Sequence, residues 1–282
     1  MLYVVSTPIG NLGDMSQRAI DTLKSCTLIA AEDTRHSAVL KQRFGIDTPM
    51  VSYQKHNERA RAAQLIERMQ SENIDVALIT DAGTPCISDP GQALVEAAHA
   101  AGIAVTAVPG PSAMVTALSL CGYELSSFSF YGFLSRKAGE REAQLSAIKT
   151  SGLDVCVLYE SPHRVSSLLE QIEALMPGAH ISAFCELTKL YERIFRGTPM
   201  QVIAQIEQSG AGERGEYVIV LKVPPHRPSA EQQWSCAQTL IALSLKGLAR
   251  KDCRTQLKKM GFNHDDIFEA ERAVRDFLQA QG

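Results

Sequence analysis

The stretch that says most about the fold is Thr80-Asp81-Ala82-Gly83-Thr84-Pro85-Cys86-Ile87-Ser88-Asp89-Pro90-Gly91. It directly follows Val76-Ala77-Leu78-Ile79, an apolar segment typical of a buried strand. Helical spacing of apolar residues begins immediately after it, over residues 93–101. A polar loop between a strand and a helix is where an α/β sheet binds its ligand. An ordinary connection needs about 2–6 residues and far fewer Gly, Pro and Asp, so a plain turn is the weaker interpretation.

Composition places the chain among soluble globular proteins. Of its 282 residues, 45% are hydrophobic and 21% are charged, and the net charge of −3 excludes a uniformly basic nucleic-acid-binding protein. The seven cysteines include no CxxC pair, which argues against a zinc or iron–sulfur site, and we expect no metal. Free thiols, no signal peptide and no apolar run long enough to span a bilayer predict a cytoplasmic protein away from membranes.

The first 121 residues alternate between strand and helix patterns. Strands are predicted over residues 2–6, 28–31, 50–52, 76–80 and 104–108. Helices are predicted between and after them, over residues 17–25, 37–44, 59–70, 91–101 and 112–120. This order favours a doubly wound, mostly parallel sheet with helices on both faces, which we expect to form an N-terminal domain over residues 1–121.

A second α/β domain with a mixed sheet is expected over residues 122–224. Its strands are predicted over residues 129–133, 155–159, 181–185, 193–196 and 217–223, with helices over 140–150, 165–175 and 200–208. The segment Pro224-Pro225-His226-Arg227-Pro228 has the composition of a linker. Residues 225–282 are then predicted to be that linker and a small appendage of three helices, over 232–243, 250–260 and 264–278. The fold class is therefore α/β with a helical appendage.

Four Gly- and Pro-rich loops follow predicted strands. They are Thr7-Pro8-Ile9-Gly10-Asn11-Leu12, the run 81–91, Pro109-Gly110-Pro111-Ser112-Ala113 and Ser161-Pro162-His163-Arg164. None contains the GxGxxG dinucleotide fingerprint or the P-loop pattern. Loops with so few lysines suit a small zwitterionic cofactor better than a triphosphate.

These loops carry a resemblance to the tetrapyrrole methylase superfamily, and within it to the bacterial subgroup that 2′-O-methylates a cytidine ribose in 16S ribosomal RNA. The matching motifs are STPIGNLGD from Ser6, AEDTR from Ala31, DAGTPCISDPG from Asp81, VPGPSA from Val108, GFLSRK from Gly132, YESPHR from Tyr159, ELTK from Glu186, RGT from Arg196 and GEY from Gly215. They occur in family order across residues 1–223, and the helical tail resembles the short domain of the subgroup. Two positions depart from the pattern: Cys185 stands where the family usually has Arg, and Ser135 where it usually has Pro.

The resemblance implies a two-domain fold that holds S-adenosyl-L-methionine in the cleft between the domains, and it implies a homodimer. The loop residues expected to bind this cofactor are Pro8, Gly10, Asp81, Ala82, Gly83, Thr84, Asp89, Ser112, Ser161, Pro162 and Gly215. Each loop taken alone could be no more than a tight turn. The reaction implied is in-line attack by a ribose 2′-hydroxyl on the sulfonium methyl group, for which positioning could supply most of the rate.

A base or a polarising group should assist this attack, because an alcohol is weakly acidic. We predict Glu186 and Asp33 as catalytic carboxylates and Lys189 as a polarising group; Glu32, His163 and Lys55 are further candidates. Each has a structural alternative. Glu186 could form an ion pair with Lys189 or Arg193, and Asp33 could cap the helix that follows it.

RNA would be held by local basic groups, because the chain is acidic overall. The candidates are Arg35, Lys55, Arg136, Lys137 and Arg164, together with Arg250, Lys251, Arg254 and Lys258 in the tail. A solvated helix surface is the alternative interpretation of the tail.

Two other functions remain open at this point. One is a tetrapyrrole C-methylase, which would need neither AEDTR nor a basic tail. The other is a non-catalytic RNA-binding assembly factor that retains the cofactor fold, although the demanding loop 81–91 argues against loss of function.

Overall fold

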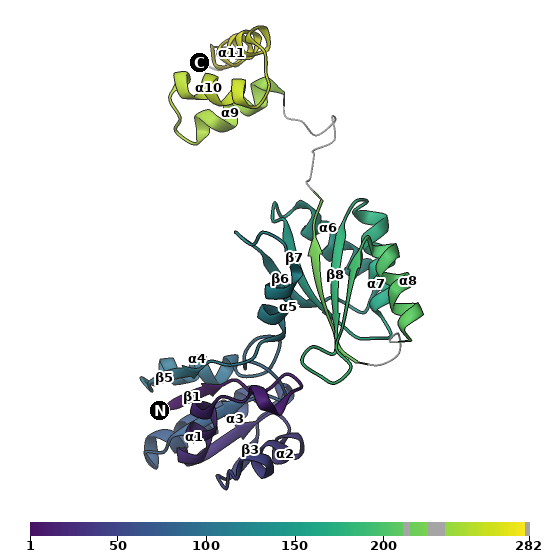
Figure 1. The fold of residues 1–282 in the computed structure, drawn as a ribbon. Helices are drawn as coiled ribbons and strands as arrows, with labels where there is room; N and C mark the ends of the chain where they lie inside the picture. Colours follow the sequence, from purple (N-terminus) through teal and green to yellow (C-terminus); the bar gives the residue numbers. More distant parts are fainter. Residues whose placement is uncertain (211–214, 225–234, 280–282) are drawn as a thin grey trace. The chain divides into compact units, whose positions relative to one another are not determined.

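The fold is taken from a computed structural model that describes residues 1–210, 215–224 and 235–279. The chain divides into two compact units, Met1–His226 and Arg227–Gly282. The first unit contains two five-stranded sheets, and the second is helical (Figure 1). Whether the first unit comprises separate domains divided at residue 121 stays a prediction.

The first sheet is entirely parallel. Its strand order is β3 (Met50–Ser52), β2 (Leu28–Ala31), β4 (Val76–Ile79), β1 (Leu2–Val5) and β5 (Val105–Val108). The helices that connect these strands are α1 (Gln17–Ser25), α2 (Thr34–Phe44), α3 (Glu58–Ser71) and α4 (Gln92–Ala100), with short 3-10 turns η1 (Leu12–Asp14) and η2 (Lys55–Asn57). Helix α2 begins three residues earlier than the sequence pattern predicts.

Helices cover both faces of this sheet, as the alternation of strands and helices predicts. Successive residues of β4 point to opposite faces: Leu78 joins a core with α3 and α4, whereas Ile79 joins one with α1 and α2. All four residues of β4 are buried, which is typical of a parallel strand with helices on both sides.

The second sheet is mixed, again as predicted. Its order is β6 (Ser129–Phe133), β7 (Val155–Glu160), β10 (Tyr217–Lys222), β8 (His180–Cys185) and β9 (Arg193–Gly197). The β6–β7 pair is parallel, and the other pairs are antiparallel. One face packs against α6 (Ala138–Thr150), α7 (Val165–Leu175) and α8 (Pro199–Ser209).

Helix α5 (Ala113–Cys121) packs against the other face of this second sheet. Its residues Ala117, Leu118 and Cys121 share a core with Val157 and Val220. The sequence pattern groups this helix with the first sheet because it continues the strand–helix alternation. The loop that precedes α5 therefore crosses from one sheet to the other.

The second unit consists of α9 (Cys236–Leu245), α10 (Arg250–Lys259) and α11 (His264–Gln279) around a small apolar core. The predicted start of the first of these helices, at residues 232–234, lies outside the described residues. In the described part of the chain no helix is both long and apolar enough to cross a membrane. The seven cysteines are thiols outside disulfides, and six of them are buried, as predicted.

Candidate active site

Three loops meet at the carboxyl edge of the first sheet. Backbone hydrogen bonds join Thr7 and Gly83 in both directions, at 2.8 and 3.1 Å. The Thr84 hydroxyl donates to the Pro111 carbonyl at 3.2 Å and lies 3.0 Å from the Ser6 hydroxyl. The loops after β1, β4 and β5 are thus fixed to one another by polar contacts.

The loop after β4 has an unusual backbone. Cys86 and Ser88 adopt left-handed conformations with φ of 71° and 66°, a region that costs L-residues about 1–2 kcal/mol each. Gly91, at φ +142°, could not accept a side chain, because a Cβ would lie 2.7 Å from Cys86 Sγ and 2.8 Å from Leu78 Cδ2. The packing of the loop therefore fixes its conformation, as the concentration of Gly and Pro in the sequence suggests.

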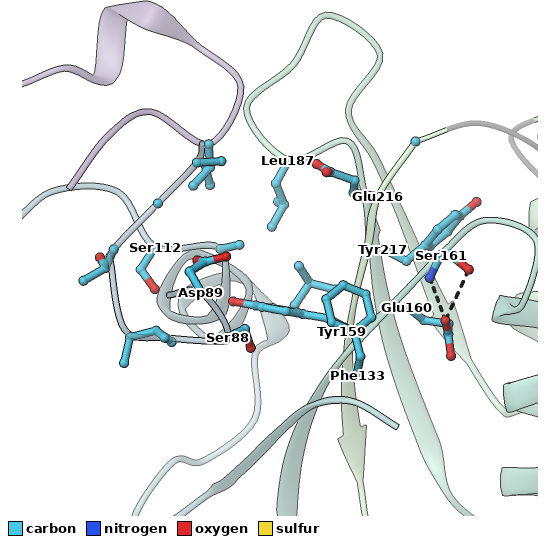
Figure 2. A pocket seen from close by; sticks show the side chains of 18 of the residues that line it. Ser88, Asp89, Ser112, Phe133, Tyr159, Glu160, Ser161, Leu187, Glu216 and Tyr217 are labelled. Carbon is cyan, nitrogen blue, oxygen red and sulfur yellow. Dashed lines mark hydrogen bonds between the residues drawn. The ribbon is translucent and has the colours of Figure 1, made fainter. Parts of the chain in front are cut away.

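A cavity of about 370 Å³ lies between these loops and one end of the second sheet (Figure 2). Its volume is within the range of small-molecule sites, about 300–1,000 Å³. Eight of the residues predicted from the sequence to bind a cofactor line it: Ala82, Gly83, Thr84, Asp89, Ser112, Ser161, Pro162 and Gly215.

Three other predicted residues are not part of the lining. Pro8 is buried within the first loop. Gly10 faces Lys189, because a Cβ at Gly10 would lie 2.4 Å from Lys189 Cγ. Asp81 turns to the loop after β2, where its carboxylate accepts a hydrogen bond from the Asp33 amide at 3.2 Å.

The sequence reasoning missed the aromatic and apolar wall of the cavity. Phe133 and Tyr159 pack edge-to-face with ring centroids 5.7 Å apart, and Tyr217 and Leu187 complete this side (Figure 2). Phe133, Tyr159 and Tyr217 all stand within the quoted motifs, but side chains in a strand alternate between faces, and the sequence does not say which face meets a ligand.

Among the described residues, three carboxylates line the cavity, and two of them have partners. Glu160 accepts a hydrogen bond from its neighbouring amide, Ser161 N, at 2.7 Å and lies 3.2 Å from Arg164 Nη2. Glu216 forms an ion pair with Lys189 at 3.0 Å. Asp89 has neither a hydrogen bond nor an ion pair with any described residue.

The pKa of Asp89 is raised to about 7. Burial is the main cause, and the nearby carboxylates of Glu32 and Asp81 add to it, whereas Lys55 opposes it. Burial also raises the pKa of Glu32, whose carboxylate accepts a hydrogen bond from the Asp81 amide at 3.3 Å. Negative charge is therefore concentrated on the Asp89 side of the cavity.

The predicted pair Glu186 and Lys189 lies just outside the lining. Glu186 Oε1 accepts hydrogen bonds from Lys189 Nζ at 2.8 Å and from the Glu216 amide at 3.1 Å. Burial lowers the pKa of Lys189, but pairing with Glu186 and Glu216 outweighs it and leaves that pKa raised. The ion pair named above as the structural alternative is present, and the catalytic roles stay predictions.

Asp33 also has the structural role that the sequence offered as an alternative. It is the N-cap of α2, and its carboxylate accepts hydrogen bonds from the Arg35 amide at 2.9 Å and from the Arg35 side chain at 2.8 Å. The hydrogen bond from the Arg35 guanidinium is the main reason that the pKa of Asp33 is lowered to about 2. Such a carboxylate is a weak base at neutral pH.

The predicted RNA-binding cations of the first unit differ in their exposure and in their contacts with the rest of the fold. Arg35 is 88% exposed despite its pair with Asp33, and Lys137 is exposed and paired with Glu140. Lys55 and Arg136 are exposed. Arg164, by contrast, donates to the carbonyls of Leu134 and Ser135 at 3.1 Å, which ties it to the fold.

The tail cations divide in the same way. Arg250 and Arg254 both pair with Glu271, whose side chain is only 4% exposed. Lys251 and Lys258 are exposed and form no ion pair with a described residue. Two of the four predicted tail residues therefore hold α10 against α11.

At the two positions that depart from the family motifs, the residues present fit their local surroundings. Cys185 is buried at the end of β8. The Ser135 amide donates to Gln144 at 2.9 Å, and its hydroxyl donates to Glu140 at 2.8 Å. In the described residues no group of His, Cys, Asp and Glu is arranged to hold a metal ion.

Comparisons with known proteins agree on one family. Residues 1–203 match the family of Tetrapyrrole (Corrin/Porphyrin) Methylases. The chain is 40% identical over 260 residues to ribosomal RNA small subunit methyltransferase I of Synechocystis sp., covering 91% of both chains. It is 43% identical over 235 residues to the protein of the same name from Vibrio cholerae, covering 83% of this chain and 80% of that protein.

Solved structures share the fold. The methyltransferase CobJ aligns with a TM-score of 0.59 and 20% identity, over 81% of this chain and 96% of its own. Uroporphyrin-III-C-methyltransferase from Thermus thermophilus aligns with a TM-score of 0.56 and 21% identity, over 78% and 93%. The α/β architecture predicted from the sequence is the architecture of these proteins.

Proposed function

The chain belongs to the tetrapyrrole methylase family, and from this premise we propose that it is an S-adenosyl-L-methionine-dependent methyltransferase of small-subunit ribosomal RNA. The finer part of the proposal is that the methyl group goes to the 2′-hydroxyl of a cytidine in 16S rRNA. The observation that carries the proposal is a cavity of ligand size lined by residues of the quoted motifs, in a chain 40% identical to a small-subunit rRNA methyltransferase over 91% of both.

The cavity residues fit S-adenosyl-L-methionine chemically. Phe133 and Tyr159 offer aromatic surface suited to an adenine ring. The backbone at Gly83 and Thr84 and the hydroxyls of Ser112 and Ser161 offer polar partners for a small zwitterion. When bound, this cofactor supplies an electrophilic methyl group on a sulfonium centre.

Positioning is the main contribution of the protein under this proposal. A cofactor held in the cavity presents its methyl group to a hydroxyl that enters from the open side. The exposed cations Arg35, Lys55 and Arg136 would hold RNA phosphates on the first unit, and Lys251 and Lys258 would hold them on the helical unit.

The proposal is tested with small ribosomal subunits from cells that lack this protein. We expect label from radioactive S-adenosyl-L-methionine to appear on one cytidine ribose after nuclease mapping. Ala82→Trp should abolish transfer, because Ala82 lines the cavity and an indole there would occupy it. Ala100→Trp is the matched control, since Ala100 is an exposed alanine of α4 outside the lining.

Each other outcome contradicts a defined part of the proposal. Label on a base would refute ribose methylation. Cofactor binding by calorimetry without any label on RNA would favour a tetrapyrrole substrate or a non-catalytic RNA binder. Equal activity of the two Trp variants would show that the cavity is not the cofactor site.

The role of the helical unit needs its own measurement. Lys251→Gln and Lys258→Gln should each weaken binding to small subunits and lower the slope of log affinity against log salt by about 1, as loss of one phosphate contact predicts. Lys24→Gln is the control, because Lys24 lies at the end of α1 that leads to the amino edge of the first sheet. An unchanged slope in both tail variants would refute the RNA role of the tail.

We also propose a cytoplasmic homodimer. Exposed apolar side chains on the first unit, such as Val115 and Leu120 on α5, support self-association. Sedimentation should give about twice the chain mass of 30.7 kDa, and a monomer at micromolar concentration would refute it.

A further inference from the structure

Among the described residues that line the cavity, Asp89 is the carboxylate without a hydrogen-bond or ion-pair partner. We propose that Asp89 is the general base that takes the proton from the attacking ribose hydroxyl. This assignment rests on the proposed function and deepens it, and it differs from the cofactor-binding role that the sequence suggests for the same residue.

Hydrogen bonding separates Asp89 from the other acidic groups near the cavity. Glu160 and Glu216 line the cavity but are committed to Ser161 and Lys189 respectively. Glu186 accepts two hydrogen bonds outside the lining. Among the described residues Asp89 is therefore the lining carboxylate whose oxygens stay available to accept a hydrogen bond, and then a proton, from a bound hydroxyl.

The loop conformation fixes the place of Asp89. Ser88, directly before it, is left-handed, and Gly132 at φ +60° allows the second sheet to approach: a Cβ there would lie 2.8 Å from Ser88 Oγ. On the other side, Glu58 Oε1 accepts hydrogen bonds from the amides of Gly91 and Ala93 at 2.8 and 3.1 Å. Backbone strain that the surroundings enforce is typical of functional sites.

Charged and titratable groups face Asp89 from several elements. Glu32 from the loop after β2 and Asp81 from its own loop raise the pKa of Asp89 beyond the effect of burial, and Lys55 of η2 lowers it. Cys86 and Tyr159 face it as well: burial is the main cause of the raised pKa of both groups, and the charge of Asp89 adds to it. Figure 2 shows the Tyr159 side chain reaching from the second sheet toward Asp89 and Ser112. A carboxylate with a pKa of about 7 is ionised in a useful fraction at neutral pH and is a stronger base than an ordinary Asp.

The step balances without a further reactant. The ribose O2′ forms a bond to the methyl carbon, the carbon–sulfur bond breaks, and its electron pair remains on sulfur. The O2′ proton passes to a carboxylate oxygen of Asp89, which later releases it to water. The sulfonium thus becomes a neutral thioether, and the balancing proton is transferred to Asp89.

The first test compares Asp89→Asn with Asp47→Asn, an exposed Asp outside the cavity. We expect Asp89→Asn to lower the single-turnover rate at saturating cofactor and RNA by 10²–10⁴-fold, the usual contribution of a general base. Calorimetry should show a cofactor affinity close to that of the wild type, because the proposed role of Asp89 is in proton transfer. Asp47→Asn should change neither quantity.

The second test follows the proton itself. The rate should rise with pH as Asp89 loses its proton. The midpoint of this rise in kcat/KM, which reports the ionisation of groups in the free enzyme, should lie near pH 7. The midpoint for kcat should be lower, because the sulfonium is cationic. Glu32→Gln keeps a hydrogen-bond acceptor for the Asp81 amide but removes a negative charge, so it should shift this rise to lower pH.

A titration of the free protein provides a measurement that does not depend on turnover. The difference in proton uptake between wild type and Asp89→Asn should show one group titrating near pH 7. Absence of that group refutes the proposal, as does an Asp89→Asn variant that loses cofactor affinity but keeps the rate at saturation. If wild-type protein transfers no methyl group to RNA, the proposed function fails first. If it transfers and Asp89→Asn does so equally fast, only the role of Asp89 fails.

Discussion

Two loops border the cavity from opposite sheets, and their backbones are strained in the same way. The loop after β4 holds Cys86 and Ser88 at φ of 71° and 66°, and the loop after β8 holds Glu186 and Thr188 at 56° and 66°. Each loop also has a carboxylate close to a glycine whose lack of a side chain lets another segment of the chain pack closely. By backbone geometry alone they are equally good candidates for the chemistry.

Their electrostatics differ. Asp89 in the first loop has no partner among the described residues and a pKa of about 7, whereas Oε1 of Glu186 in the second accepts hydrogen bonds from Lys189 and the Glu216 amide. In the second loop the strained backbone holds Glu186 in an ion pair with Lys189, just outside the lining of the cavity. Strain identifies a constrained loop, and unmatched charge identifies the group free to react.

The largest effect should come from neutralising the two carboxylates separately. Asp89→Asn should reduce the single-turnover rate by 10²–10⁴-fold, as argued above, whereas Glu186→Gln should reduce it by less than about tenfold, because an amide can still accept the hydrogen bonds from Lys189 and the Glu216 amide. Single-turnover methylation of small subunits measures both. A larger loss in Glu186→Gln would reverse the comparison and return the catalytic role to Glu186, as the sequence suggests.

The next largest effect concerns one glycine at each loop: Gly91 within the loop after β4, and Gly215, which precedes β10 and packs against Glu186 of the loop after β8. Gly91→Ala should lower the free energy of unfolding by about 2–4 kcal/mol, because strain adds to overpacking against buried Leu78. Gly215→Ala should cost only about 1–2 kcal/mol, since its Cβ would meet the Glu186 side chain, which can rotate away.

Urea denaturation of both variants at one pH checks this difference. Equal losses would show that the two loops are equally rigid, and the contrast drawn between them would then be limited to charge.

The sequence predicted this region unevenly, for physical reasons. The alternation of strands and helices determined the parallel sheet, and the loop motifs located eight cavity residues, because both signals are local. The wall formed by Phe133 and Tyr159 depends on which face of a distant strand meets the first sheet. The contrast between Asp89 and Glu186 depends on charged groups up to 57 positions away, such as Glu32 near Asp89, and no local sequence pattern records them.

A smaller effect should appear in the pH dependence of stability. The unfolded chain loses the Asp89 proton near pH 4 and the folded chain near pH 7, so the folded state binds more protons in that interval and stability falls as pH rises through it. Asp89→Asn should therefore be more stable than wild type at pH 8, by about 1–2 kcal/mol after allowance for solvent screening, and nearly equal to it at pH 4.

Glu186→Gln should show the opposite sign at pH 8, with a loss of about 0.5–1 kcal/mol from its ion pair with the partly exposed Lys189. Thermal unfolding at the two pH values measures both. If Asp89→Asn were less stable than wild type at pH 8, Asp89 would be a structural carboxylate and the distinction between the two loops would disappear.

The smallest effect should come from relieving the backbone itself. Thr188 is β-branched at φ +66°, and its buried hydroxyl has no hydrogen-bond partner among the described residues. Glycine removes a conformational cost of about 1–2 kcal/mol but adds about 0.5–1 kcal/mol of unfolded-state entropy, so Thr188→Gly should stabilise the fold by about 0.5–1 kcal/mol. Ser88→Gly should gain less, because its hydroxyl lines the cavity and is exposed. If instead Thr188→Gly destabilised the protein, the side chain of Thr188 would be holding the ion-paired loop in place, and strain would be a structural device in that loop and a catalytic one in the other.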